Sequence, residues 1–210
     1  MATPQQAHDS VALLYFNDEE ARTVEAVAER IIPGDGTDPG ATDAGVVYYI
    51  DRAVAGVSTD LQTVYRRGLR ALEDHCRREH GAAFVDLDPA TQDEVVRRFL
   101  GPEIQDSGEG IQFGPADQPD GTILLRFFAV IREHTVEGFF CDPAYGGNRG
   151  AVGWKLVGFP GAYWGYTAEE MGPGFDGRSL PIKTLSDLRR ELRSLPPNEV
   201  FTRNQTEPEH

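Results

Sequence analysis

Hydrophobic positions recur at helical spacing along most of the chain, and turn residues divide them into separate helices. The first helix is expected over residues 18–32, because Asn17 and Glu20 form a capping-box pair before it and Pro33 follows it. Further stretches with the same period predict helices at about 43–54, 59–80, 89–100 and 185–195. The most apolar stretch, 122–140, is expected to be the central buried helix, with its apolar side formed by Ile123, Leu124, Phe127, Phe128, Ile131 and Val136.

Strand signals are weak throughout, because no stretch alternates cleanly between apolar and polar residues for more than four or five positions. The pattern predicts an all-α fold, an irregular bundle of five to six helices with long Gly/Pro-rich loops. We expect one helical domain at 16–196 between a flexible segment at 1–15 and a tail at 197–210 that is loose or docked on a partner. Residues 103–121 are polar and are expected to form a surface loop.

The charge of the chain narrows the classes of partner. It carries 34 acidic and 20 basic side chains, a net charge of −14. Phosphate backbones and anionic lipid surfaces repel such a protein, so neither nucleic-acid binding nor membrane binding is expected. No apolar run reaches the ~20 residues that cross a bilayer. The first ten residues show no export signal, so we expect a cytoplasmic protein, with a periplasmic location in an exported complex as the alternative.

Candidate metal ligands have simpler structural interpretations. Cys76 and His80 lie four residues apart on one predicted helical face, which is half of a metal site, but Cys76 also continues an apolar stripe. Asp35, Asp38 and Asp43 lack the register of a calcium loop and are typical of turns whose side chains bind nearby amides. We therefore expect no metal site.

Candidate catalytic residues are few. His134 falls near the buried side of the central helix and is the one histidine that we consider as a general base, with Glu137 or Asp142 as a carboxylate partner. A buried histidine is more often a hydrogen-bonded core residue. No nucleophile-elbow serine is present, and the segment 145–150 matches neither nucleotide-binding glycine pattern.

Residues 141–181 have a different composition, rich in glycine and aromatic residues and without a helical or strand period. Aromatic residues and arginines anchor protein–protein contacts, and glycines allow two backbones to approach closely. The sequence therefore predicts a docking region here. The alternative is that the rings cover one end of the helical core.

Two segments resemble the gluconate 2-dehydrogenase subunit 3 family. The first is DPAYGGNR at 142–149, continued by VGWKLVGFPG at 152–161. The second is the opening run 16–51, with IIPG at 31–34 and DAGV at 43–46. The resemblance extends over about 16–195.

The resemblance implies a small accessory subunit without catalysis of its own. Members of this family accompany a flavoprotein large subunit of the glucose–methanol–choline type, which carries FAD and oxidises sugars, sugar acids or alcohols. A cytochrome c subunit often accepts the electrons. We expect this chain to bind no cofactor and to contact its partner through Tyr145, Gly146, Gly147, Asn148, Arg149, Trp154, Lys155, Phe159 and Trp164.

Two alternatives remain open at this point. One is a small stand-alone enzyme that uses His134 with a nearby carboxylate. The other is a carbohydrate-binding module in which Trp154 and Trp164 stack on sugar rings.

Overall fold

The computed structural model describes residues 12–100 and 121–194, and within them the fold is entirely helical. The helices are α1 (Asp18–Ile31), α2 (Val46–Ala55), α3 (Gln62–His80), α4 (Pro89–Leu100), α5 (Gly121–Phe140), α6 (Val152–Val157) and α7 (Leu185–Ser194). One isolated bridge, between Gly161 and Lys183, is the extent of β pairing in these ranges. The all-α prediction is confirmed, with seven helices rather than five to six.

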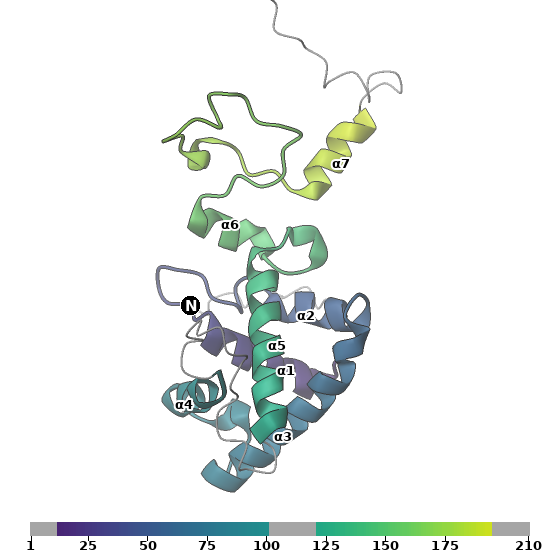
Figure 1. Ribbon diagram of the computed structural model, residues 1–210, viewed down its shortest axis with the longest axis vertical. Helices are drawn as coiled ribbons and strands as arrows, with labels where there is room; N and C mark the ends of the chain where they lie inside the picture. Colours follow the sequence, from purple (N-terminus) through teal and green to yellow (C-terminus); the bar gives the residue numbers. More distant parts are fainter. Residues whose placement is uncertain (1–11, 101–120, 195–210) are drawn as a thin grey trace, which may run out of the picture.

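Helix α5 is the centre of the bundle, and α1, α2, α3 and α4 all pack against it (Figure 1). Tyr65 of α3 and Phe127 and Phe128 of α5 are fully buried where these helices meet. The predicted central helix is therefore confirmed, apart from Val136, which is 46 % exposed rather than buried. None of the described helices has the length and apolar character to cross a membrane.

The helix starts follow local hydrogen bonding. The capping box is present as predicted: the Asn17 side chain accepts from the Glu20 N–H, and the Glu20 carboxylate accepts from the Asn17 N–H. The expected cap of the second helix is wrong. The Asp43 carboxylate accepts from the Gly40 N–H instead, and α2 begins after Gly45, whose backbone is left-handed. Asp35 likewise closes its own turn by accepting from Thr37 and Asp38.

The short helix α6 is the element that periodicity missed. It spans six residues and lies between Ala151 and Gly158, which both have left-handed backbones. Two turns are too few for an apolar period to be recognised in a sequence. After α6 the chain leaves the bundle and forms a loop and α7 at the opposite end of the molecule from the tip of α3 (Figure 1). The expected loop at 103–121 lies outside the described residues except for Gly121, as do the expected tail at 197–210 and the segment 1–11.

A buried carboxylate holds the start of the chain against α2. Asp51 is 1 % exposed and accepts hydrogen bonds from the backbone N–H groups of Leu14, Tyr15 and Phe16, at 2.6, 2.9 and 2.9 Å. Such bonds to a buried charged acceptor are stronger than neutral ones. The folded domain therefore includes Leu14 and Tyr15, which we predicted to be part of the flexible segment.

We expect Asp51→Asn to destabilise the fold by about 1–3 kcal/mol, because the amide presents an N–H group to backbone donors and loses the charge. The control is Asp60→Asn, at an exposed aspartate between α2 and α3. Urea unfolding of the two variants measures the difference in stability. Equal midpoints for the two variants would contradict this role of Asp51.

Candidate functional site

The segment that follows α5 folds back over the last turn of that helix, and Asn148 is its central hydrogen-bonding residue. The fully buried Asn148 side chain donates from Nδ2 to the Cys141 carbonyl at 2.8 Å and accepts at Oδ1 from the Gly153 N–H at 2.8 Å. Its backbone is left-handed, with φ of 44°, which asparagine tolerates better than most residues. One side chain therefore connects the end of α5 to the start of α6.

Trp154, in α6, makes a second hydrogen bond to the end of α5. Its indole Nε1–H donates to the Phe140 carbonyl at 2.7 Å, and the ring is 5 % exposed and packs edge-on against Phe159. The last carbonyls of an α-helix have no partner within the helix, so side chains must supply one when the end is buried. Asn148 and Trp154 both supply such donors beyond the end of α5.

Two glycines let this segment approach the helix end closely. A Cβ atom at Gly147 would lie 2.2 Å from the Gly138 carbonyl oxygen, and one at Gly153 would lie 2.1 Å from the Phe139 carbonyl oxygen. Both obstacles are backbone atoms, which cannot rotate away. Any larger residue would separate the segment from α5.

Asp142 and Arg149 connect this segment to the rest of the fold. Asp142 accepts from Ala144 N–H at 2.9 Å and, with its other oxygen, from Leu185 N–H at 2.7 Å, which fixes the start of α7. The Arg149 guanidinium lies 3.8 Å from the centre of the Tyr48 ring, and the backbone N–H of Arg149 donates to the Ala44 carbonyl. The two segments that carry the sequence resemblance, around 43–46 and 142–161, are thus in direct contact.

The structure separates the predicted partner-binding residues into two groups. Gly146, Gly147, Asn148 and Trp154 are buried, and Arg149 is half-buried against Tyr48. The exposed members are Tyr145, Lys155, Phe159 and Trp164. The buried residues make contacts inside the chain. Contact with a partner stays a prediction, and the exposed side chains are the ones accessible for it.

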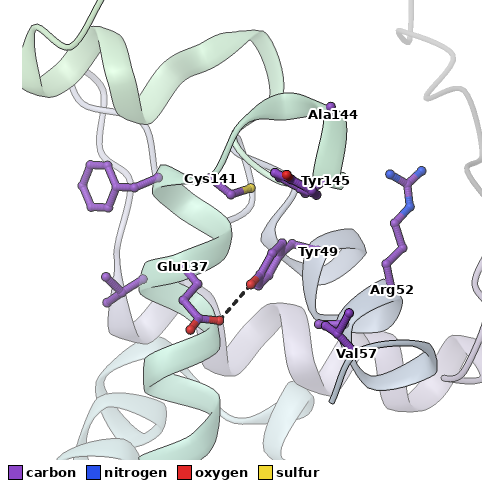
Figure 2. Close-up of a pocket in the computed structure, with 10 residues that line it drawn as sticks. Tyr49, Arg52, Val57, Glu137, Cys141, Ala144 and Tyr145 are labelled. Carbon is purple, nitrogen blue, oxygen red and sulfur yellow. Dashed lines mark hydrogen bonds between the residues drawn. The ribbon is translucent and has the colours of Figure 1, made fainter. Parts of the chain in front are cut away.

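A groove of about 730 Å³ lies beside Tyr145, between α2 and α5 (Figure 2). We call it the Tyr145 groove, and its walls are formed by Tyr49, Arg52, Ala53, Val57, Val136, Glu137, Phe140, Cys141, Ala144 and Tyr145. Sequence reasoning found Tyr145 but missed the α2 wall. The signal available was the exposed side of residues 49–57, which carries aromatic and aliphatic residues where a surface helix is usually polar.

Three of the polar groups in the Tyr145 groove are hydrogen-bonded to each other or stay protonated at neutral pH: Tyr49, Glu137 and Cys141. The Tyr49 hydroxyl donates to Glu137 Oε2 at 2.8 Å, and burial together with this hydrogen bond raises the pKa of Tyr49 well above its ordinary value. Burial also raises the pKa of the Cys141 thiol to about 11, so the thiol stays protonated and poorly nucleophilic at neutral pH. These groups suit binding better than catalysis.

His134 is a core residue that packs on Tyr65. It is 5 % exposed, its Nδ1 and the Tyr65 hydroxyl are hydrogen-bonded at 2.9 Å, and the two rings are stacked. Burial lowers the pKa of His134 below its ordinary value. Both carboxylates proposed as its catalytic partners have other bonds, Glu137 to Tyr49 and Asp142 to Ala144 and Leu185. Neither Glu137 nor Asp142 is therefore a free carboxylate partner for His134.

Potential metal ligands are scattered in the described part of the chain, which contains no group of three or more His, Cys, Asp or Glu side chains placed to hold an ion. Cys76 is fully buried in the apolar core, where burial raises the pKa of its thiol to about 12, whereas His80 is exposed. Cys76 behaves as a small hydrophobic residue.

Comparison with known proteins identifies the family of the chain. A family model described as gluconate 2-dehydrogenase subunit 3 matches residues 18–161, from the first residue of α1 to the end of the segment that closes over α5. The chain belongs to this family. No curated protein and no solved structure matches the subunit significantly. The match ends before α7, so it is shorter than the resemblance that we noted over 16–195.

We expect Gly147→Ala and Gly153→Ala each to destabilise this subunit by about 3 kcal/mol, the upper part of the range for overpacking, because a backbone carbonyl blocks the new methyl group. Gly165→Ala is the matched control, since no atom lies within 4 Å of its added Cβ. Thermal and urea unfolding measure the effect. A loss in Gly165→Ala as large as in the other two variants would refute the close-approach argument.

The low pKa of His134 predicts an acid-dependent loss of stability. Below about pH 6.5 the unfolded chain binds a proton that the folded chain excludes, so the free energy of unfolding falls as the pH decreases towards the folded pKa. We expect His134→Gln to have a shallower decline between about pH 6.5 and 5 than the wild type. An unchanged slope in His134→Gln would count against a buried neutral imidazole.

Proposed function

We propose that this subunit is the non-catalytic accessory subunit of a heteromeric FAD-dependent dehydrogenase that oxidises a sugar, a sugar acid or an alcohol. The observation that carries the proposal is the family match over residues 18–161. The partner is a flavoprotein of the glucose–methanol–choline type, which bears the FAD and the reacting groups, and a cytochrome c subunit is a further candidate component. The chain itself binds no cofactor in this proposal.

The chemistry of the described residues supports an accessory role. We call residues 142–161 the family segment. Its buried polar side chains are engaged inside the chain, where Asn148, Trp154 and Asp142 bind backbone groups. The groove beside them has mostly apolar walls, and burial raises the pKa values of its Tyr49 hydroxyl and its Cys141 thiol. Such a surface is suited to covering apolar surface on another protein.

Neither alternative has comparable support. A stand-alone enzyme needs His134 accessible to a substrate, and this residue is buried with its Nδ1 bonded to Tyr65. A sugar platform formed by Trp154 and Trp164 needs two exposed rings, and Trp154 is 5 % exposed. Trp164, at 56 % exposed, is accessible as a single ring.

The test is to isolate tagged subunit from its native cell extract and to record the absorption spectrum of the eluate. We expect a larger protein to co-purify with the visible bands of oxidised flavin. That flavoprotein is then expressed with and without the subunit. We expect lower yield, a lower unfolding temperature and lower dehydrogenase activity when the subunit is omitted, because a partner that binds the folded state stabilises it.

The matched control is co-expression with Gly147→Ala, which should support the flavoprotein less well than Gly165→Ala does. Equal yield, stability and activity of the flavoprotein with and without the wild-type subunit would overturn the proposed function. A colourless eluate that contains the subunit alone would do the same.

A further inference from the structure

We propose that the Tyr145 groove is the surface on which the flavoprotein docks, and that it receives an apolar segment of that protein carrying an aspartate or glutamate that pairs with Arg52. This inference rests on the proposed function and adds to it the place and chemistry of contact. Three features of the groove support it. Its walls are apolar and exposed, its cation Arg52 is unpaired among the described residues, and Tyr145 at its edge belongs to the family segment.

Four of the side chains that line the groove are apolar and exposed to solvent. Val57 at the end of α2 is 91 % exposed, Tyr145 is 54 %, Val136 is 46 % and Phe140 is 38 %. They come from the turn that follows α2, from α5 and from the turn at Pro143–Tyr145, so the patch is made by tertiary structure and not by one amphipathic helix (Figure 2). Contiguous exposed apolar surface of this kind marks an interaction site.

Tyr145 stands out within the family segment. The neighbouring residues Asp142, Gly147 and Asn148 are explained by their contacts to α5, α6 and α7, whereas the Tyr145 ring projects from its turn into the groove (Figure 2). An exposed tyrosine offers a large rigid ring and a polar hydroxyl at a small entropic cost, which is why tyrosines are frequent at the centres of interfaces.

The charges of the groove are asymmetric. Arg52 makes no hydrogen bond or ion pair to any residue of 12–100 or 121–194, and its side chain lies against Gly146, where a Cβ would be 2.8 Å from Nη1. Glu137, on the other side of Tyr49, is already bonded to the Tyr49 hydroxyl (Figure 2). Of the two charged side chains in the groove, Arg52 is thus the one without a partner in the described part of the chain, and a carboxylate is its complement.

The same charges disfavour a second copy of this subunit as the occupant. Two chains of net charge −14 repel each other at moderate ionic strength. A copy docked in the groove would also have to bring a carboxylate to Arg52 against that repulsion. An apolar segment of a different protein with one acidic residue satisfies both the walls and the cation.

The test uses the complex of this subunit with the flavoprotein that co-purifies with it. Binding of the separated subunits is measured for Tyr145→Ala and Arg52→Glu. We expect each variant to weaken binding by at least about tenfold, as for a central interface residue. Salt should weaken the wild-type complex, and Arg52→Glu should remove or reverse that dependence.

Matched controls separate docking from folding. Val85→Ala removes a partly exposed hydrophobic residue outside the groove, and Arg67→Glu reverses an exposed arginine on α3; both should bind as the wild type does. Unfolding midpoints of all four variants should equal that of the wild type. Wild-type affinity for both Tyr145→Ala and Arg52→Glu, in a complex that still forms, would overturn the groove and leave the proposed function intact.

A photo-crosslink identifies the occupant directly. With Tyr145 replaced by p-benzoyl-phenylalanine, irradiation of the complex should join the subunit to a flavoprotein peptide that contains apolar residues and an aspartate or glutamate. A crosslink to a second copy, to another part of the same chain or to no protein would refute this occupant. If the wild-type subunit recovers no flavoprotein, the proposed function fails first, and the docking proposal fails with it.

Discussion

The carbonyl groups at the C-terminal end of α5 need hydrogen-bond donors, and the arrangement of the chain that follows α5 depends on this need. This helix is the centre of the bundle, and its last turn is covered by the chain that follows it. Buried carbonyls without donors are costly, so the covering segment has to carry donors at fixed places. Asn148 and Trp154 provide them, and the two glycines allow the approach that makes those bonds possible.

The surface of the molecule follows from the same arrangement. Because the turn at Pro143–Tyr145 is held by Asp142 on one side and by Asn148 on the other, it can present a large aromatic side chain without being part of the core. The buried residues of the segment thus act as a rigid base, and Tyr145 is displayed on it. Rigid display of an aromatic ring reduces the entropy that is lost when a partner binds.

The sequence predicts the bundle well because α1, α3, α4 and α5 are long and either amphipathic or apolar. Gly45 and Asp43 show where local reasoning fails: a plausible cap closed an earlier turn, because the left-handed Gly45 already determined where α2 begins. Val136 fails for a tertiary reason. It lies on an apolar helix, but none of the elements in 12–100 and 121–194 covers that end of the α2–α5 contact.

The candidate site could be located from the sequence but not divided into its parts. Glycine and aromatic residues indicated a contact region, and the resemblance indicated a partner. Nothing in the order of residues shows that Asn148 and Trp154 point inwards while Tyr145 points outwards, because these directions depend on left-handed backbones at 146, 148, 150 and 151. Arg52 of α2 and Val57, in the turn after α2, lie about ninety residues earlier in the chain, and only the fold brings them to Tyr145.

The single bridge between Gly161 and Lys183 has an evolutionary consequence. Ala162 donates to the Lys183 carbonyl and Lys183 donates to the Pro160 carbonyl, so the chain between them leaves and returns at one narrow neck. The family match ends at this neck. A change of length in the loop between Gly161 and Lys183 is therefore expected to disturb the bundle less than a change within 142–161, whose residues contact the end of α5.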